Sequence, residues 1–295
     1  MFRKSPARRF YIGAFLCLAF ITCFVISTTV SAAQPFLTQD QNPFSLIHGQ
    51  PQAVAAQLPE ANTAQWSLTL DVTNTLNNET NSTETIFMDF ESYNLRFSWL
   101  HGLNENWALK VDIPLTYYGE GFLDNTIDNW HEFFHLPRAD RPNVTDNQFH
   151  IFYDKNGQTL IDLNTANSGL GDIQIALGRN MLKKQDSTLS LWVSADLPTG
   201  DSSNLTGNDA SDLSLWLAGD YQFHPEWSID ANIGVLFPGG NYVSNLAIED
   251  QVFFVYAGIQ WQAHESFDLR MQFNGHSQFY SDSQLLLLGS AYNMV

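Results

Sequence analysis

Cysteine is almost absent from this chain of 295 residues. The two cysteines, Cys17 and Cys23, both lie in an apolar N-terminal stretch, and neither is preceded by the small residues of a lipoprotein signal. If that stretch is removed, no cysteine remains in the mature protein. Disulfide bonds and thiol chemistry are then excluded.

Charge, and positive charge above all, is also scarce. Charged residues make up 15% of the sequence, well under the roughly 25% usual for soluble domains. Four of the 13 Lys and Arg residues lie within the first nine positions, which leaves nine against 31 acidic residues and a net charge of −22. Because phosphate groups bind clustered Lys and Arg, the composition excludes a nucleic-acid partner.

Only one long hydrophobic run is present, Phe10 to Val30, and the mean hydropathy is −0.17. Basic residues precede the run, and Ser31-Ala32-Ala33 offers a small-residue cleavage site. We interpret residues 1–33 as a secretory signal peptide, with an uncleaved anchor helix as the alternative. The remaining chain does not have the composition of a helical membrane protein.

Alternation of apolar and polar residues is the dominant pattern. In Leu213 to Phe237 two 11-residue runs of alternating character lie on either side of His224-Pro225-Glu226. Side chains on a strand point to alternate faces, so each run predicts a strand with one apolar and one polar face, and the pair predicts a hairpin. Eleven residues is the length with which a tilted strand crosses a bilayer.

The same pattern recurs along residues 66–295, after a proline-containing, extended N-terminal segment at residues 34–65. We expect about ten strands of an antiparallel up-and-down transmembrane β-barrel, an all-β fold. Ile86, Met88 and Phe90 have the opposite parity to Tyr93, Leu95 and Phe97, which predicts a bulge near Glu91. The ten expected strands lie near residues 66–72, 85–99, 107–118, 173–177, 189–197, 213–223, 227–237, 253–261, 267–273 and 285–295.

The connections alternate between short turns and mostly longer loops, and aromatic residues flank three of the short turns. Phe223 and Trp227 are one such pair. This sidedness is typical of outer-membrane barrels of Gram-negative bacteria. We therefore expect the cell outer membrane as the location, with its lipid bilayer and the outer-membrane assembly machinery as partners.

Periodicity does not determine whether the apolar face points outward to lipid or inward, as in a soluble barrel. Strand length, aromatic residues at strand ends and the polar character of the other face favour the outward arrangement. With that arrangement, we expect arginine at Leu217 to harm folding far more than arginine at Ala218, which would face the lumen.

Residues 119–172 form a long loop insertion. Leu123, Ile127, Trp130 and Phe134 follow a helical spacing, and Asp154-Lys155-Asn156-Gly157 predicts a hairpin turn. An apolar helix face must be buried against another surface. We expect the helix to cap the barrel mouth, with Trp130 and Phe134 toward the barrel as binding residues.

His131-Glu132-Phe133-Phe134-His135 matches the HExxH pattern of zinc hydrolases. However, Pro137 ends the predicted helix, and no further ligand follows at a suitable spacing. We expect no metal, no cofactor and no catalytic residues, so that the protein is not an enzyme. A zinc hydrolase using His131, Glu132 and His135 is the alternative.

Charged residues on the polar faces of the strands are the main candidates for a binding function. If these faces line a lumen, the charges set its electric field; a closed interior of paired charges is the alternative. We interpret a separate acidic loop around Asp201, Asn208 and Asp212 as a solvated turn rather than a calcium site. The strand charges are Arg96, Lys110, Asp112, Asp196, Asp220, Asp230, Asp268 and Arg270.

Several segments together resemble a known family. They are QNPF (41–44), GFLDNTIDNWHEFFHLP (121–137), SGLGDI (168–173), LPTGD (197–201) and LTGNDASDLSLWL (205–217). They are similar to an uncharacterised proteobacterial family of outer-membrane barrels known as domain of unknown function 3187. The resemblance covers about the whole mature chain and implies the fold, but it implies no activity. Because family members continue to a final strand ending in an aromatic residue, the resemblance also implies about two further strands, twelve in a complete form.

The LGD and LPTGD elements also resemble outer-membrane transporters found in phenol-degradation pathways. The function that these patterns favour is passive transport or binding of small or apolar molecules, with a small-molecule ligand. A filled-lumen structural or interaction protein is the first alternative. A surface hydrolase using the insertion at 119–172 is the second.

Overall fold

A computed structural model describes residues 34–137, 141–264, 267–289 and 291–294. The expected signal peptide, residues 1–33, lies outside the described residues. Within these ranges, no helix is long and apolar enough to cross a membrane.

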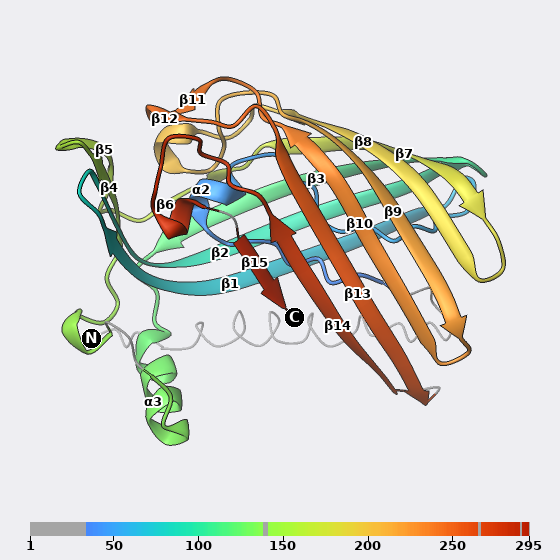
Figure 1. Ribbon diagram of the computed structural model, residues 1–295, viewed down its shortest axis with the longest axis horizontal. Helices are drawn as coiled ribbons and strands as arrows, with labels where there is room; N and C mark the ends of the chain where they lie inside the picture. The colour runs from blue at the N-terminus through green and yellow to red at the C-terminus, as the bar shows by residue number, and fades with distance from the viewer. Residues whose placement is uncertain (1–33, 138–140, 265–266, 290, 295) are drawn as a thin grey trace, which may run out of the picture. The chain divides into compact units, whose positions relative to one another are not determined.

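Antiparallel strands form nearly the whole structure (Figure 1), which confirms the predicted all-β fold. The main sheet has 13 strands, and its nine long strands match nine of the ten expected ones. A small hairpin forms a separate sheet from β11 (Tyr242–Val243) and β12 (Leu246–Ala247). The strands of the main sheet are β1 (Ala64–Thr80), β2 (Glu84–Asn104), β3 (Trp107–Gly119), β4 (His150–Lys155), β5 (Gln158–Leu163), β6 (Asn167–Leu170), β7 (Ile173–Lys183), β8 (Ser187–Leu197), β9 (Leu213–His224), β10 (Trp227–Phe237), β13 (Val252–His264), β14 (Phe267–His276) and β15 (Ala291–Met294).

Sheet order follows chain order, as in an up-and-down barrel. Neighbours run β15-β14-β13-β10-β9-β8-β7-β3-β2, and β1 pairs with β2. The predicted insertion is present as helix α3 (Asp124–Phe134) and the hairpin β4–β5, of which β4 also pairs with β2. Among the described residues no pairing joins β1 to β15, so the sheet curves but does not close into a barrel.

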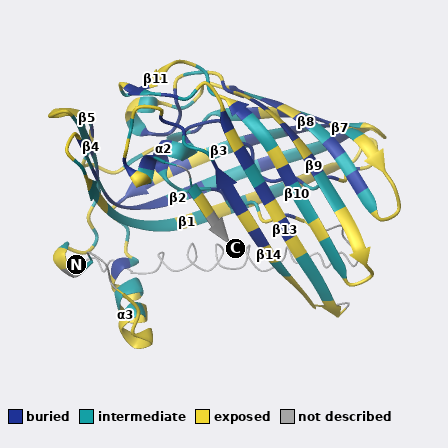
Figure 2. Ribbon diagram, in the orientation of Figure 1, coloured by how far each residue is buried: buried dark blue, intermediate teal, exposed yellow. Residues whose placement is uncertain are grey.

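The apolar face of the strands points outward. On β9, Leu213, Leu215 and Leu217 are 53%, 45% and 45% exposed, whereas Ser214, Trp216 and Ala218 are buried. Figure 2 shows the same alternation along the neighbouring strands. Ala218 lies on the inward face, as expected, and is 0% exposed; the greater harm of arginine at Leu217 than at Ala218 stays a prediction.

An apolar cluster fills the interior at the long-loop end. Ile86, Met88 and Phe90 on β2 are 0–1% exposed and belong to this cluster, together with Phe44 and Tyr153. The pairing of β1 with β2 runs from Ala64↔His101 to Thr80↔Thr85 without a register shift. The expected bulge near Glu91 is therefore wrong. The parity of the apolar residues changes because the apolar core lies inside the curved sheet at this end.

The chain before β1 enters the concave side of the sheet (Figure 1) and adds buried apolar residues such as Phe44 and Ile47 to the core. We call residues 34–58 the plug segment. Its single helical turn, α2 (Pro43–Leu46), begins at Asn42, whose side chain accepts a hydrogen bond from Phe44 N at 3.1 Å, with proline at the first turn. Asn42 Nδ2 also donates to Leu287 O at 2.6 Å. The QNPF motif thus both starts this turn and attaches it to the C-terminal part of the chain.

The tenth expected strand, residues 285–295, is present only in part. Leu286–Leu288 form a 3-10 turn, η3, and β15 pairs with β14 over four residues, from His276↔Ala291 to Phe273↔Met294. The weak alternation of this stretch agrees with its short pairing.

Candidate functional site

Two side-chain amides bind the backbone of the plug segment to the wall. Asn232 on β10 accepts from Val54 N at 3.0 Å and donates to Val54 O at 3.0 Å. Gln272 on β14 accepts from Phe36 N at 2.9 Å and donates to Phe36 O at 3.0 Å. Both amides are at most 1% exposed and occupy inward positions between outward apolar neighbours. Asn232 satisfies the buried N–H and C=O of Val54, which no strand partner pairs, and Gln272 does the same for Phe36, an exposed residue.

A third attachment lies at Gly49. Asp212, in the loop before β9, accepts from Gly49 N at 2.7 Å and from Gly239 N at 2.6 Å. A Cβ at position 49 would collide with the Asp196 carboxylate and with Asp212. Glycine is therefore required here by close approach, since the plug backbone packs directly on two carboxylate side chains.

His48, next to this glycine, is fully enclosed. Its Nε2 lies 3.3 Å from the Tyr280 hydroxyl, its Nδ1 lies 3.2 Å from Asn208 Nδ2, and its ring stacks on Phe279 at 4.5 Å. Burial, with the nearby charge of His276, lowers the pKa of His48 to about 3. The imidazole is therefore neutral at physiological pH and holds the plug as an uncharged hydrogen-bonding group.

The family motifs meet beside this point. Asp172 of the SGLGDI segment accepts from Gly200 N of LPTGD at 2.7 Å and from Asn208 N of the third motif at 3.2 Å. Thr199 Oγ1 donates to Gly171 O at 2.6 Å. Gly200 and Gly207 pack so closely that a Cβ on Gly200 would lie 2.6 Å from the Gly207 Cα. The three motifs thus build one loop cluster, and Asp212 extends it to the plug.

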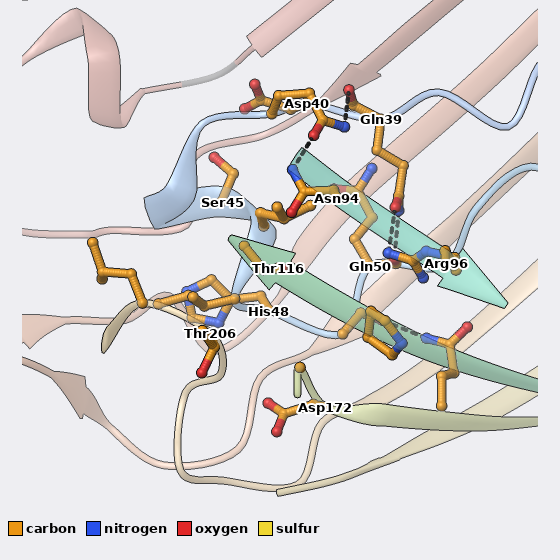
Figure 3. Close-up of a pocket in the computed structure, with 18 of the residues that line it drawn as sticks. Gln39, Asp40, Ser45, His48, Gln50, Asn94, Arg96, Thr116, Asp172 and Thr206 are labelled. Atoms are coloured by element: carbon orange, nitrogen blue, oxygen red, sulfur yellow. Dashed lines mark hydrogen bonds between the residues drawn. The ribbon is translucent and has the colours of Figure 1, made fainter. Parts of the chain in front are cut away.

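A polar cavity lies between the plug segment and the inner wall (Figure 3). Its volume, measured as the space open to the centre of a water molecule, is about 40 Å³. Arg96 Nη2 donates to Gln39 Oε1 at 3.0 Å, and Asn94 Nδ2 donates to Gln41 Oε1 at 2.6 Å. The side-chain amide oxygen of Asn94, Oδ1, is buried and has no hydrogen-bond partner. Four carboxyl groups and one guanidinium line this cavity, those of Asp40, Asp71, Asp172, Asp196 and Arg96.

The eight predicted strand charges all lie on inward positions, but the cavity contains only two of them, Arg96 and Asp196. Four others form two ion pairs farther along the interior. Arg270 Nη2 lies 2.7 Å from Asp230 Oδ2, and Lys110 pairs with Asp112, which also accepts from Ser98 Oγ at 2.5 Å. The remaining two are Asp220, opposite Asp230 on the neighbouring strand, and Asp268, which accepts from Gln260.

Helix α3 is not a lid. Trp130 and Phe134 are 59% and 50% exposed and contact each other at 4.4 Å. The expectation that they face the barrel mouth is wrong, because α3 projects away from the sheet (Figure 1).

The HExxH match does not present a helical histidine pair. His135 is the C-cap of α3, in the left-handed conformation at φ 57°, so it does not continue the helical face of His131. His131 Nδ1 contacts Pro137 O at 2.8 Å. In the described part of the chain no group of three or more His, Cys, Asp or Glu residues is arranged to hold a metal ion.

Sequence reasoning missed the residues that hold the plug. His48 and Gly49 lie in a stretch without periodicity, and Asn232 and Gln272 look like ordinary inward polar residues. The available signal was the group of glycine-rich motifs, whose glycines mark close backbone approach. Asp212, interpreted as part of a solvated loop, is 2% exposed.

Comparison with known proteins gives these relationships. The COG4313 outer membrane channel from Pseudomonas putida F1 is 14% identical, with 80% of this chain and 76% of that chain covered and a TM-score of 0.47. A Pseudomonas aeruginosa FadL homologue is 9% identical, with 84% and 80% covered and a TM-score of 0.33. No curated protein matches the chain. Residues 14–292 match the family described as Protein of unknown function (DUF3187). The chain therefore belongs to the DUF3187 family.

Proposed function

We propose that the protein is an outer-membrane barrel that passes small hydrophilic solutes, and that the plug segment restricts this passage. The observation that carries the proposal is the polar cavity between the plug segment and the wall. The plug is held there by hydrogen bonds from side chains and by the buried apolar residues that it adds to the core, such as Phe44 and Ile47. It makes no strand pairing with the described sheet, so its release would leave the sheet intact.

The outer surface supports the membrane location. On β10 the outward residues run from Trp227 through Ile229 and Ile233 to Phe237. At about 3.3 Å per residue this stretch spans about 33 Å. A tilt of about 40° reduces it to about 25 Å, the height of the apolar band of an outer-membrane barrel. Trp227 stacks on Trp261 at 5.6 Å, as expected for an aromatic girdle beside the short turns.

The lining of the cavity favours a hydrophilic solute over an apolar one. Apolar ligands bind in pockets lined by hydrophobic side chains with few polar groups. Here apolar side chains such as Ile47 and Leu95 share the lining with amides, four carboxyl groups and Arg96, and an apolar ligand would leave these polar groups without partners. The carboxylates outnumber the single guanidinium, which favours cations over anions.

Planar-bilayer recording tests the proposal. With a potassium chloride gradient, the purified protein should conduct with a reversal potential that indicates cation preference. Asp71→Asn should lower this preference and Arg96→Gln should raise it, because both side chains line the cavity. The filled-lumen alternative predicts no conductance, even after the plug is released by the substitutions described in the Discussion, and that outcome would overturn the proposal.

A further inference from the structure

Helix α3 is attached firmly at one end and uncovered along its apolar face. The face consists of Ile127, Trp130, Phe133 and Phe134, which fall on one side of an 11-residue helix. Phe133 is 76% exposed, and Phe133 and Phe134 contact only at their edges, with centroids 4.8 Å apart. Acidic and amide side chains such as Asn125 and Glu132 occupy the opposite side.

The attachment fixes the start of the helix on the outer face of the wall. Glu91 on β2 accepts from Phe122 N at 2.8 Å and from Leu123 N at 2.5 Å. Asp124 accepts from Asn74 Nδ2 on β1 at 2.8 Å and from Arg141 Nη1 at 2.9 Å. Asn74 lies directly opposite Glu91 across the two strands, and both have the parity of the outward apolar residues.

The position of this attachment along the strands indicates the depth at which α3 begins in a bilayer. Tyr93 on β2 and Tyr117 on β3, 5.8 Å apart, form an outward aromatic pair, and Phe87, farther along β2 with the same outward parity, contacts His150 of β4. Glu91 lies two residues beyond Tyr93, which is about 7 Å along the strand. The polar layer of a bilayer extends about 5–8 Å beyond the hydrocarbon on each side. The helix therefore starts within the headgroup layer and runs across the direction of β1 instead of continuing it (Figure 1).

We propose that α3 lies in the headgroup layer of the bilayer as an interfacial helix, with Trp130, Phe133 and Phe134 inserted toward the lipid chains. Amphipathic helices with Trp and Phe on one face bind membranes in this way, and aromatic side chains favour this depth. The apolar face of α3 is then continuous with the outward apolar surface of β1 and β2. This inference rests on the proposed membrane location of the wall.

Site-directed spin labelling tests the inference on the full chain in phospholipid vesicles. Cys17 and Cys23 are replaced by serine, and single cysteines are introduced by Phe133→Cys, Glu132→Cys and Leu217→Cys. Oxygen reports exposure to lipid, and a water-soluble nickel chelate reports exposure to water. The Phe133→Cys label should favour oxygen several-fold more than the Glu132→Cys label, its neighbour on the polar side. The Leu217→Cys label should show the lipid exposure of the wall.

The outcomes separate the two proposals. Nickel accessibility at position 133 equal to that at 132, with position 217 in lipid, would overturn the helix inference alone. Exclusion of both reagents at position 133 would also overturn it, because the face would then be covered by protein, such as a second copy of the chain. Water exposure at both 133 and 217 would instead overturn the membrane location.

Discussion

Replacing Asn232 by alanine should release the middle of the plug segment from the wall. The amide makes both hydrogen bonds of Val54, at 3.0 Å each, in a fully buried setting. Alanine leaves a buried N–H and a buried C=O without partners, and each such group costs about 1–3 kcal/mol. The docked plug should therefore lose about 2–6 kcal/mol, and the lower figure already raises the released population about 30-fold.

Single-channel recording in planar bilayers measures this directly. Asn232→Ala should increase the fraction of time spent in the higher conductance state, and hydrogen exchange of the backbone around Val54 should accelerate. Asn180→Ala is the matched control, because Asn180 bonds Glu105 O in an exposed turn of the wall and not the plug segment. If Asn232→Ala leaves both conductance and exchange at wild-type values, the plug is not held by this amide and the reasoning is refuted.

Three further perturbations examine the plug and the wall. Gly49→Ala should weaken docking and raise conductance, because the added methyl collides with two aspartates; Gly219→Ala, which meets only ordinary contacts beginning at 3.5 Å, should leave conductance unchanged. Leu217→Arg should lower the free energy of unfolding in lipid vesicles by about 2–4 kcal/mol, whereas Phe223→Arg near the rim should cost about 0–1 kcal/mol. Equal losses in urea titrations would argue against an outward lipid-facing band. Acidification should open the channel, with a pH dependence that His48→Gln reduces.

The sign of the pH effect follows from His48. Docking lowers the pKa of its imidazole from 6.5 to about 3, so the docked state binds the proton less well than the released state. Docking is at full strength above pH 6.5 and weakens by about 1.36 kcal/mol per pH unit as pH falls toward 3. Burial raises the pKa of Asp212, which opposes this trend. A channel that closes further on acidification would contradict the assignment to His48.

The sequence alone determined the strands and the residues that share a face. Alternation in Leu213 to Phe237 is a local property of the chain, because successive side chains on any strand point in opposite directions. The sequence also predicted the short turns, the helix near residues 123–134 and the hairpin turn at residues 154–157. The segments SGLGDI, LPTGD and LTGNDASDLSLWL carried the resemblance to the family, which the match over residues 14–292 confirms.

Only the tertiary structure decided which face is inside and what fills it. The alternation along a strand is the same whether its apolar face points inward or outward. The structure distinguishes the two arrangements, because Trp216 is buried and Leu217 is exposed. The parity change at Ile86–Phe90 suggested a bulge locally, but it reflects an apolar core supplied by Phe44 from another part of the chain. The plug contacts join residues 163 to 236 positions apart, Gly49 to Asp212, Val54 to Asn232 and Phe36 to Gln272. No local pattern encodes such pairs, because they exist only once the sheet has curved and placed its inner face around the N-terminal segment.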